Sequence, residues 1–140
     1  MKQHLMGNIN TIARCAALYR DRQLETLQIT GWQAPYLPQI CDAPGITQDQ
    51  LAARLHVNRS NVTRQLAMLE EKGFVRRQRS TNDRRAIEVY ATERGYAALP
   101  AVKQAYAKWR ELLFSGLQPQ ERELLEELLE RLARRAEEIG

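Results

Sequence analysis

Two short alternating segments joined by a polar, arginine-rich tip constrain the fold of this chain more than any other feature. Apolar and polar residues alternate in 74–79 and again in 86–91, and residues 80–85 between them are polar or charged. This pattern predicts a β-hairpin with an exposed basic tip. A two-stranded ribbon has little apolar surface of its own, so it must pack against other elements. Taken alone, the hairpin fits two interpretations equally well: its arginines contact a polyanion, or they only keep it in solution.

The composition of the 140-residue chain predicts one domain whose excess positive charge is confined to one segment. Residues 47–95 carry ten basic and six acidic side chains, whereas the remainder carries eleven of each. Such a local excess favours a nucleic-acid surface. Two cysteines make no disulfide framework, and the sequence contains neither a long apolar run nor a signal peptide. We therefore expect a cytoplasmic protein with no membrane partner.

The residues before the hairpin predict two short helices joined by a tight turn. Thr47 and Gln50 have the spacing of a capping box at the start of the first helix. Asn58 is placed to cap a second helix of about four turns, and Gly73 ends it with a left-handed residue. His56 occupies the turn, where it tolerates a left-handed conformation better than most residues do. Two such helices followed by a β-ribbon form a winged helix-turn-helix.

The second helix of this pair has one apolar face and one polar face. Val62, Leu66 and Leu69 form the apolar stripe that must face the core. The opposite face carries small or hydrogen-bonding side chains, which a helix needs in order to reach base edges in the major groove. Arg64 is the candidate for a guanine contact, and Asn61 is the candidate for an adenine contact. The remaining candidate DNA contacts on this helix are Arg59, Ser60 and Thr63, with the first two near phosphates at the helix start.

Several motifs of the chain together resemble the MarR family of bacterial transcription regulators. They are Leu-Ala at 51–52, Asn-Val-Thr-Arg at 61–64, Leu-Glu-Glu-Lys-Gly-Phe-Val at 69–75, Asp-Arg-Arg-Ala at 83–86 and Thr-Glu-Arg-Gly at 92–95. The resemblance covers essentially the whole chain. It implies a mainly α fold with a small β-hairpin wing, in which residues 30–95 form the winged helix-turn-helix DNA-binding lobe. Residues 1–27 and 96–140 would form a helical dimerisation lobe, so that residues 1–140 are a single MarR-type domain.

The same resemblance assigns roles to the wing residues. Arg85 would reach into the minor groove of the DNA, and Asp83 would orient Arg85 through a salt bridge. Arg84 would meet phosphate or solvent, and Arg79 completes the candidate wing contacts. Elementary chemistry agrees, because narrow A/T-rich minor grooves attract arginine and a carboxylate partner pre-organises its side chain.

The flanking segments predict helices and a dimer. Residues 3–27 have the pattern of an amphipathic helix, and a second helical pattern runs from Thr92 to about residue 115. Pro100 should kink that second helix or break it in two. The last helix, opened by Pro119, carries a stripe too wide for one partner helix, which favours a two-fold dimer over an internal core alone. The stripe consists of Leu124, Leu125, Leu128, Leu129, Leu132, Ala136 and Ile139.

Two kinds of signal remain open for a regulator of this type. Proteins that resemble this chain often bind small phenolic or aromatic acids where the two lobes meet, and Tyr19, Trp32 and Tyr36, expected on helices beside that junction, are the candidate effector contacts. The alternative is that these aromatics belong only to the core and the interface. Redox sensing would use a cysteine, but Cys15 does not match the position of the family's peroxide-reactive cysteine, and a cysteine on an apolar helix is usually just buried. No spacing predicts a metal site or a cofactor.

The sequence contains no motif with catalytic spacing, so we expect no enzyme and no catalytic residue. A winged helix used only for protein–protein contacts is the alternative from another class, and the gathered positive charge disfavours it. The prediction is a sequence-specific transcriptional regulator that binds double-stranded DNA as a homodimer at a pseudo-palindromic operator. Repression is the expected outcome, with release by a small aromatic effector.

Overall fold

The computed structural model describes residues 4–140, which form six α-helices and a small antiparallel sheet. The helices are α1 (Leu5–Gln23), α2 (Tyr36–Asp42), α3 (Gln48–Leu55), α4 (Arg59–Glu71), α5 (Glu93–Phe114) and α6 (Pro119–Ile139). A 3₁₀ turn, η1 (Glu25–Leu27), follows α1, and the strands are β1 (Ile46–Thr47), β2 (Val75–Arg79) and β3 (Ile87–Ala91). The mainly α fold with a β-hairpin wing is thus confirmed. The chain divides into two compact units, one ending at Ala107 and one running from Lys108 to Gly140.

The helix ends in the first unit follow the local signals of the sequence. The capping box at Thr47 and Gln50 is complete, with hydrogen bonds of 2.9 and 3.1 Å between each side chain and the other's backbone N–H. His56 ends α3 in the left-handed region at φ 54°, and Asn58 caps α4 by accepting from a backbone N–H at 2.8 Å. Gly73, at φ 87°, turns the chain out of α4 into β2. The predicted helix-turn-helix therefore forms from its own capping residues.

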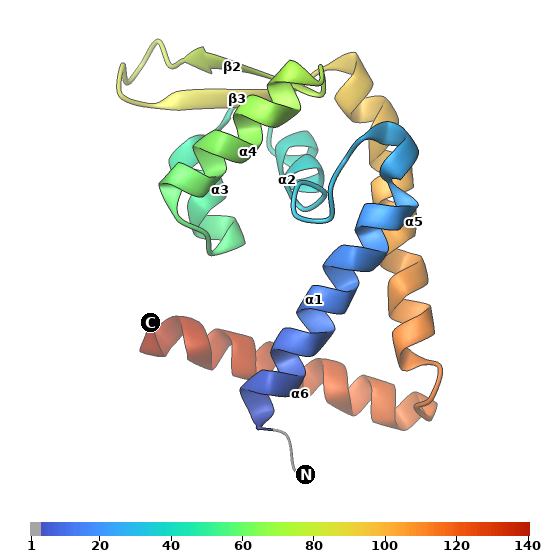
Figure 1. Cartoon of the computed structure of the whole chain (residues 1–140). Helices are drawn as coiled ribbons and strands as arrows, with labels where there is room; N and C mark the ends of the chain where they lie inside the picture. The colour runs from blue at the N-terminus through green and yellow to red at the C-terminus, as the bar shows by residue number, and fades with distance from the viewer. Residues whose placement is uncertain (1–3) are drawn as a thin grey trace. The chain divides into compact units, whose positions relative to one another are not determined.

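The sheet places β3 between β1 and β2, with all pairs antiparallel. Val89 is the centre of the register, because it pairs with Ile46 on one side and with Arg77 on the other. Figure 1 shows the loop between β2 and β3 extending beyond α3 and α4. The base of this hairpin is held tightly against the start of α5: a Cβ atom at Gly95 would lie 2.3 Å from the carbonyl oxygen of Phe74. The hairpin therefore has a fixed base and a protruding tip.

One hydrophobic core holds α4 against α3, α2 and the sheet. The predicted stripe of Val62, Leu66 and Leu69 is fully buried. Other fully buried members of the cluster are Leu37, Ile40, Leu51, Phe74, Val89 and Val102. Each such side chain contributes about 1.5–3 kcal/mol of stability relative to its exposed state. This burial fixes which face of α4 remains available to a partner.

The structure corrects one prediction about the flanking helices and decides part of another. Helix α1 ends at Gln23 and not at residue 27, because Leu24 and Ile29 turn into the core and Gln28 adopts a left-handed conformation at φ 61°. Residue 3, the predicted start, lies outside the described residues. Of the two outcomes predicted for Pro100, a kink or a break, the break does not occur, because α5 continues through it as one helix. Pro100 is exposed, so water can satisfy the carbonyl that its ring leaves without a donor.

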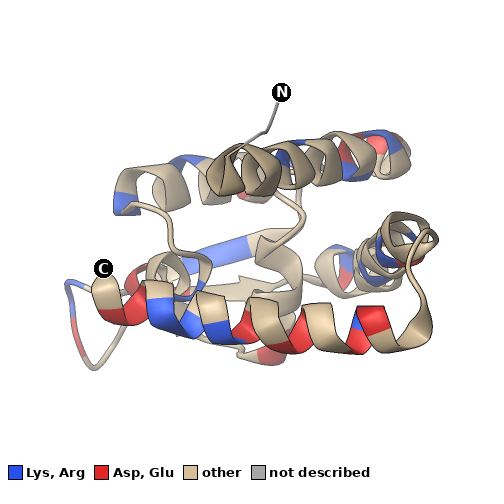
Figure 2. Cartoon of the chain, turned by 90° about the horizontal axis from the view of Figure 1, so that it is seen from below, with Lys and Arg blue, Asp and Glu red and all other residues tan. Residues whose placement is uncertain are grey.

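The second unit consists of the end of α5 and helix α6. Gln118 and Glu121 form a capping box at the start of α6, and Pro119 occupies its first position, as predicted. Arg110 and Glu126 form an ion pair within this unit. Acidic and basic residues both lie along α6 (Figure 2), while most of its leucines remain exposed. Among the described residues, no helix has the length and apolar character that a membrane span requires.

Candidate nucleic-acid interface

The start of α4 is a capped helix end that carries exposed polar side chains. Asn58 Oδ1 accepts from the backbone N–H of Asn61 at 2.8 Å and from the hydroxyl of Ser60 at 2.9 Å. The helix start also concentrates partial positive charge, because its first N–H groups have no partner within the helix. Arg59 and Ser60 are exposed here. Arg59 Nε lies 3.3 Å from the carboxylate of Asp49, and both side chains are mostly in water, so this pair is weak and can open.

The candidate base-contacting residues of α4 lie next to each other. Arg64 Nη2 donates to Asn61 Oδ1 at 3.0 Å, one helical turn away. This bond holds an exposed guanidinium along the helix surface with its remaining donors free. Thr63 is also exposed, but its hydroxyl donates to the carbonyl of Arg59 at 3.0 Å and accepts from Gln48 at 3.2 Å. The structure therefore brings Asn61 and Arg64 together and uses the Thr63 hydroxyl internally.

The wing tip is ordered by short-range hydrogen bonds. Ser80 Oγ accepts from the backbone N–H groups of Asn82 and Asp83 at 3.2 Å each. Arg79 donates to the carbonyl of Arg84 at 2.5 Å, which ties the end of β2 across the loop. Among the described residues, Asp83 and Arg85 form no side-chain ion pair. Asp83 instead accepts from the backbone N–H of Arg85 at 3.0 Å, so it shapes the loop rather than the guanidinium.

Some basic side chains in and near the wing are exposed to solvent, whereas others bond to groups within the protein. Arg84 and Arg85 are exposed at the tip. Arg77, a basic residue of the first hairpin strand, instead pairs with Glu70 at 3.0 Å, and its side chain is only 22% exposed. The strand alternation could have indicated this, because Arg77 shares a face with the buried Val75. Lys72 is also used internally, donating to the carbonyl of Gln28 and to Gln33 Oε1.

The candidate effector aromatics do not form one group. Trp32 lies in a turn, not on a helix as predicted, and is 61% exposed. Trp32 and the buried Tyr36 line one cavity of about 330 Å³ beside α4. Its other lining residues are Pro35, Leu55, Val57, Asn61 and Gln65. Tyr19 is half-buried on α1 and is not part of this lining.

Two residues of this lining each hold a buried polar atom that has no hydrogen-bond partner within residues 4–140. The hydroxyl of Tyr36 and Gln65 Oε1 are buried without a hydrogen bond. Burial raises the pKa of Tyr36 above its usual value, and the nearby Arg64 offsets part of this rise. The phenol therefore stays protonated near neutral pH.

The thiols and the metal-binding side chains form no comparable site. Burial raises the pKa of the Cys41 thiol, which disfavours the reactive thiolate, and Lys103 offsets only part of that rise. Cys15 is exposed on α1 and not buried as expected. Within residues 4–140, no cluster of three or more histidine, cysteine or acidic side chains is placed to hold a metal ion.

Comparison with known proteins gives consistent matches. The MarR family model matches residues 30–87. The transcriptional regulator YybA of Bacillus subtilis, of the helix-turn-helix type, is 27% identical over 133 residues, which are 95% of this chain and 89% of that protein. A crystal structure of MarR is 33% identical and covers 99% of this chain and 94% of its own, with a TM-score of 0.90. A putative MarR family regulator from Listeria monocytogenes, complexed with a 26-mer DNA, shares the fold at 22% identity and a TM-score of 0.86, over 96% of this chain and 89% of that one.

These matches agree with the geometry of the first unit. A capped helix-turn-helix is followed by a basic wing, and the match to MarR extends over nearly the whole chain. Regulators of this kind bind DNA and catalyse no reaction. The chain belongs to the MarR family of DNA-binding transcriptional regulators.

Proposed function

We propose that this regulator binds a pseudo-palindromic duplex operator as a homodimer and represses transcription there. Helix α4 lies in the major groove, with Arg64 and Asn61 on base edges and Arg59 and Ser60 near phosphates. Arg85 reaches the adjacent minor groove from the wing. Residues 30–95 act as the DNA-binding lobe, and residues 1–27 and 96–140 act as the dimerisation lobe. Repression follows when the bound dimer covers a promoter.

The observation that carries this proposal is the hydrogen bond between the exposed Arg64 and the half-buried Asn61 on the capped helix α4. The N-cap, the buried stripe and the turn at His56 leave the helix only one face for a partner. That face presents one guanidinium fork and one amide, the two groups that read guanine and adenine most specifically. The Thr63 hydroxyl, which is already bonded, contributes by packing rather than by reading a base.

The role of Arg85 is tested by titrating duplex DNA against the Arg85→Ala variant. Affinity for a duplex with A/T-rich flanks should fall by roughly tenfold, because a narrow minor groove attracts arginine strongly. The slope of log affinity against log salt should also fall by about one. Arg14→Ala, which removes an exposed charge from α1, should change neither quantity. The minor-groove role would be contradicted if Arg85→Ala bound A/T-flanked duplexes as tightly as wild type does, and G/C-flanked duplexes likewise.

For the signal, we favour a small neutral aromatic effector over a redox mechanism. The residues that line the cavity at Trp32 and Tyr36 carry no formal charge, and Arg64 acts on Tyr36 from outside this lining, so we favour a neutral ring over an aromatic acid. Tyr36 and Gln65 each hold a buried polar atom without a hydrogen bond, and a ligand that reached these atoms would satisfy them. Asn61 also lines the cavity, so an occupied cavity would compete with DNA for a base-contacting residue. Tyr19 would act only indirectly, since it lies outside this lining.

The effector proposal is tested with phenol as a probe and benzoate as its charged counterpart. Phenol should release the protein from its operator at lower concentration than benzoate does. Tyr36→Phe should weaken the phenol effect by about two- to tenfold, which is the usual cost of one lost hydrogen bond. Tyr96→Phe, at an exposed tyrosine of α5, is the matched control. If benzoate acts at lower concentration, or both variants respond like wild type, this cavity is not the effector site.

A further inference from the structure

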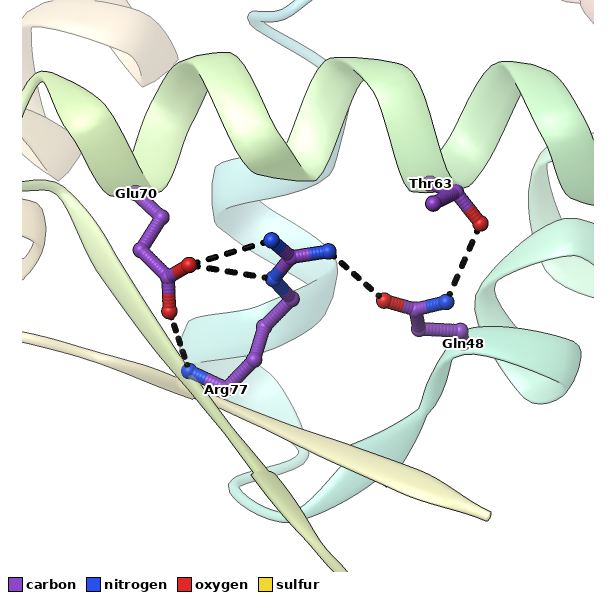
Figure 3. Close-up of polar contacts among 4 residues, drawn as sticks. All are labelled: Gln48, Thr63, Glu70 and Arg77. Atoms are coloured by element: carbon purple, nitrogen blue, oxygen red, sulfur yellow. Dashed lines mark hydrogen bonds and ion pairs between the residues drawn. The ribbon is translucent and has the colours of Figure 1, made fainter. Parts of the chain in front are cut away.

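A chain of polar contacts joins the wing to two separate points on α4 and passes through Arg77 (Figure 3). Arg77 donates from Nη2 and Nε to Glu70 Oε1, at 3.0 and 3.3 Å, and from its backbone N–H to Glu70 Oε2 at 2.9 Å. Its Nη1 donates to Gln48 Oε1 at 3.3 Å. Gln48 Nε2 in turn donates to the hydroxyl of Thr63 at 3.2 Å. Strand β2, helix α3 and helix α4 are thereby connected through side chains.

The burial of Gln48, at the middle of this chain, makes the connection specific. Gln48 is 4% exposed, so both ends of its amide are committed to partners inside the protein. All three guanidinium nitrogens of Arg77 donate within the chain. An arginine held in this way is poorly placed to act as a free cation toward phosphate. Its planar fork matches a carboxylate and an amide together, which a lysine cannot reproduce.

The two attachment points on α4 lie on one side of the helix. Thr63 and Glu70 are seven residues apart, which is close to two full turns and about 10 Å along the axis. Two anchors on the same side resist both rotation of α4 about its axis and sliding along it. A recognition site loses function when its groups move by about 0.5 Å or 10–20°. Thr63 also precedes Arg64 directly, so this anchor lies next to the main candidate base contact.

We propose that Arg77 is a positioning residue for DNA recognition, which fixes the orientation of α4 relative to the wing through Glu70, Gln48 and Thr63. This role rests on the proposed placement of α4 in the major groove. The Arg77 guanidinium does not contact DNA in this account. Its effect on specificity is transmitted through the helix that carries Arg64 and Asn61.

The first test replaces Arg77 by methionine and by lysine and measures operator affinity at several salt concentrations. Both variants should lose affinity for the operator by about tenfold, the size of one coupled contact. The salt slope should stay at the wild-type value, because no phosphate contact is lost. The proposal would be overturned if Arg77→Lys kept the wild-type operator affinity while the salt slope of Arg77→Met fell by about one. That result would show that Arg77 is a direct phosphate ligand.

The second test uses Glu70→Gln, which keeps the shape of the side chain and removes a negative charge. Simple electrostatics predicts tighter binding to a polyanion after this change. The positioning role predicts the opposite, a loss of operator affinity similar to that of Arg77→Met. The double variant Glu70→Gln, Arg77→Met should be no weaker than either single variant, because both break one linkage. Tighter binding by Glu70→Gln, or strictly additive losses in the double variant, would overturn the proposal.

Three further variants and measurements distinguish a positioning role of Arg77 from misfolding and from a failure of α4 to bind DNA. Thermal unfolding of Glu70→Gln, whose substitution is isosteric, checks that the fold is retained during the DNA measurement. Arg76→Met serves as the matched neighbour, because Arg76 is exposed on β2 and lies over the Tyr90 ring at 4.3 Å instead of joining the network. Its operator affinity should stay above that of Arg77→Met. Arg64→Ala reports separately whether α4 reads the operator at all.

Discussion

Replacing Leu128 and Leu132 by glutamate is expected to convert the regulator to a monomer and to lower its operator affinity by roughly a hundredfold or more. These two residues are 41% and 51% exposed on α6, although both are leucines. They belong to an apolar stripe that repeats every three to four residues, and such contiguous patches mark interfaces. A carboxylate without a partner is costly to bury, so two of them should open the proposed dimer. A monomer contacts one half-site and loses the advantage of linked binding.

Two measurements check this expectation. Light scattering on a size-exclusion column gives the mass of the protein in solution, and anisotropy with a labelled operator gives its affinity. The matched control is Glu127→Gln with Arg131→Gln, at exposed positions one residue before each leucine. That variant should stay dimeric with wild-type affinity. A Leu128→Glu, Leu132→Glu protein that remains dimeric and binds normally would show that this stripe is not the dimer interface.

The Arg64→Ala variant is expected to lose about five- to 150-fold in operator affinity, equivalent to about 1–3 kcal/mol for one bidentate base contact. Arg64 is exposed on α4, and Asn61 holds its guanidinium at 3.0 Å. A base-reading arginine should also confer preference at one position of the operator. Selection from a random duplex pool with Arg64→Ala should therefore return the wild-type consensus with that position relaxed in each half-site.

A charge-matched control isolates base reading from general electrostatics. Arg54→Ala removes an exposed arginine from α3, where it donates to Gln39 at 3.3 Å. It should leave the selected consensus unchanged. Binding of Arg64→Ala to unrelated duplexes should fall much less than binding to the operator, because phosphate contacts carry non-specific affinity. An equal fall on both kinds of duplex would identify Arg64 as a phosphate ligand.

Local signals in the sequence predicted the DNA-binding part of the fold well. The capping box at Thr47, the cap at Asn58, the left-handed His56 and Gly73 are all decided by residues within a few positions of each other. The buried stripe of α4 follows from helical periodicity alone. These features need no knowledge of distant contacts, which explains why a motif-level interpretation succeeded.

Features that depend on distant contacts were not predictable in the same way. Strand β1 has two residues, too few for a pattern, and forms only because β3 lies beside it. Helix α1 ends where Leu24 enters the core, a packing event that overrides its helical pattern. The internal use of Arg77 requires Glu70 and Gln48, which come from two other elements. The Asp83 contact is a local exception: its carboxylate accepts from the backbone N–H of Arg85, two residues along the chain, and this turn replaces the predicted ion pair.

In the proposed homodimer, helix α4 and the wing of each of the two chains bind one duplex symmetrically. The most direct measurement is a hydroxyl-radical footprint of the purified protein on its selected operator. The account predicts two protected half-sites, about 10 base pairs apart and related by a pseudo-two-fold axis, with further minor-groove protection outside them. A single asymmetric half-site protected at saturation, or the absence of any footprint at low salt, would contradict it.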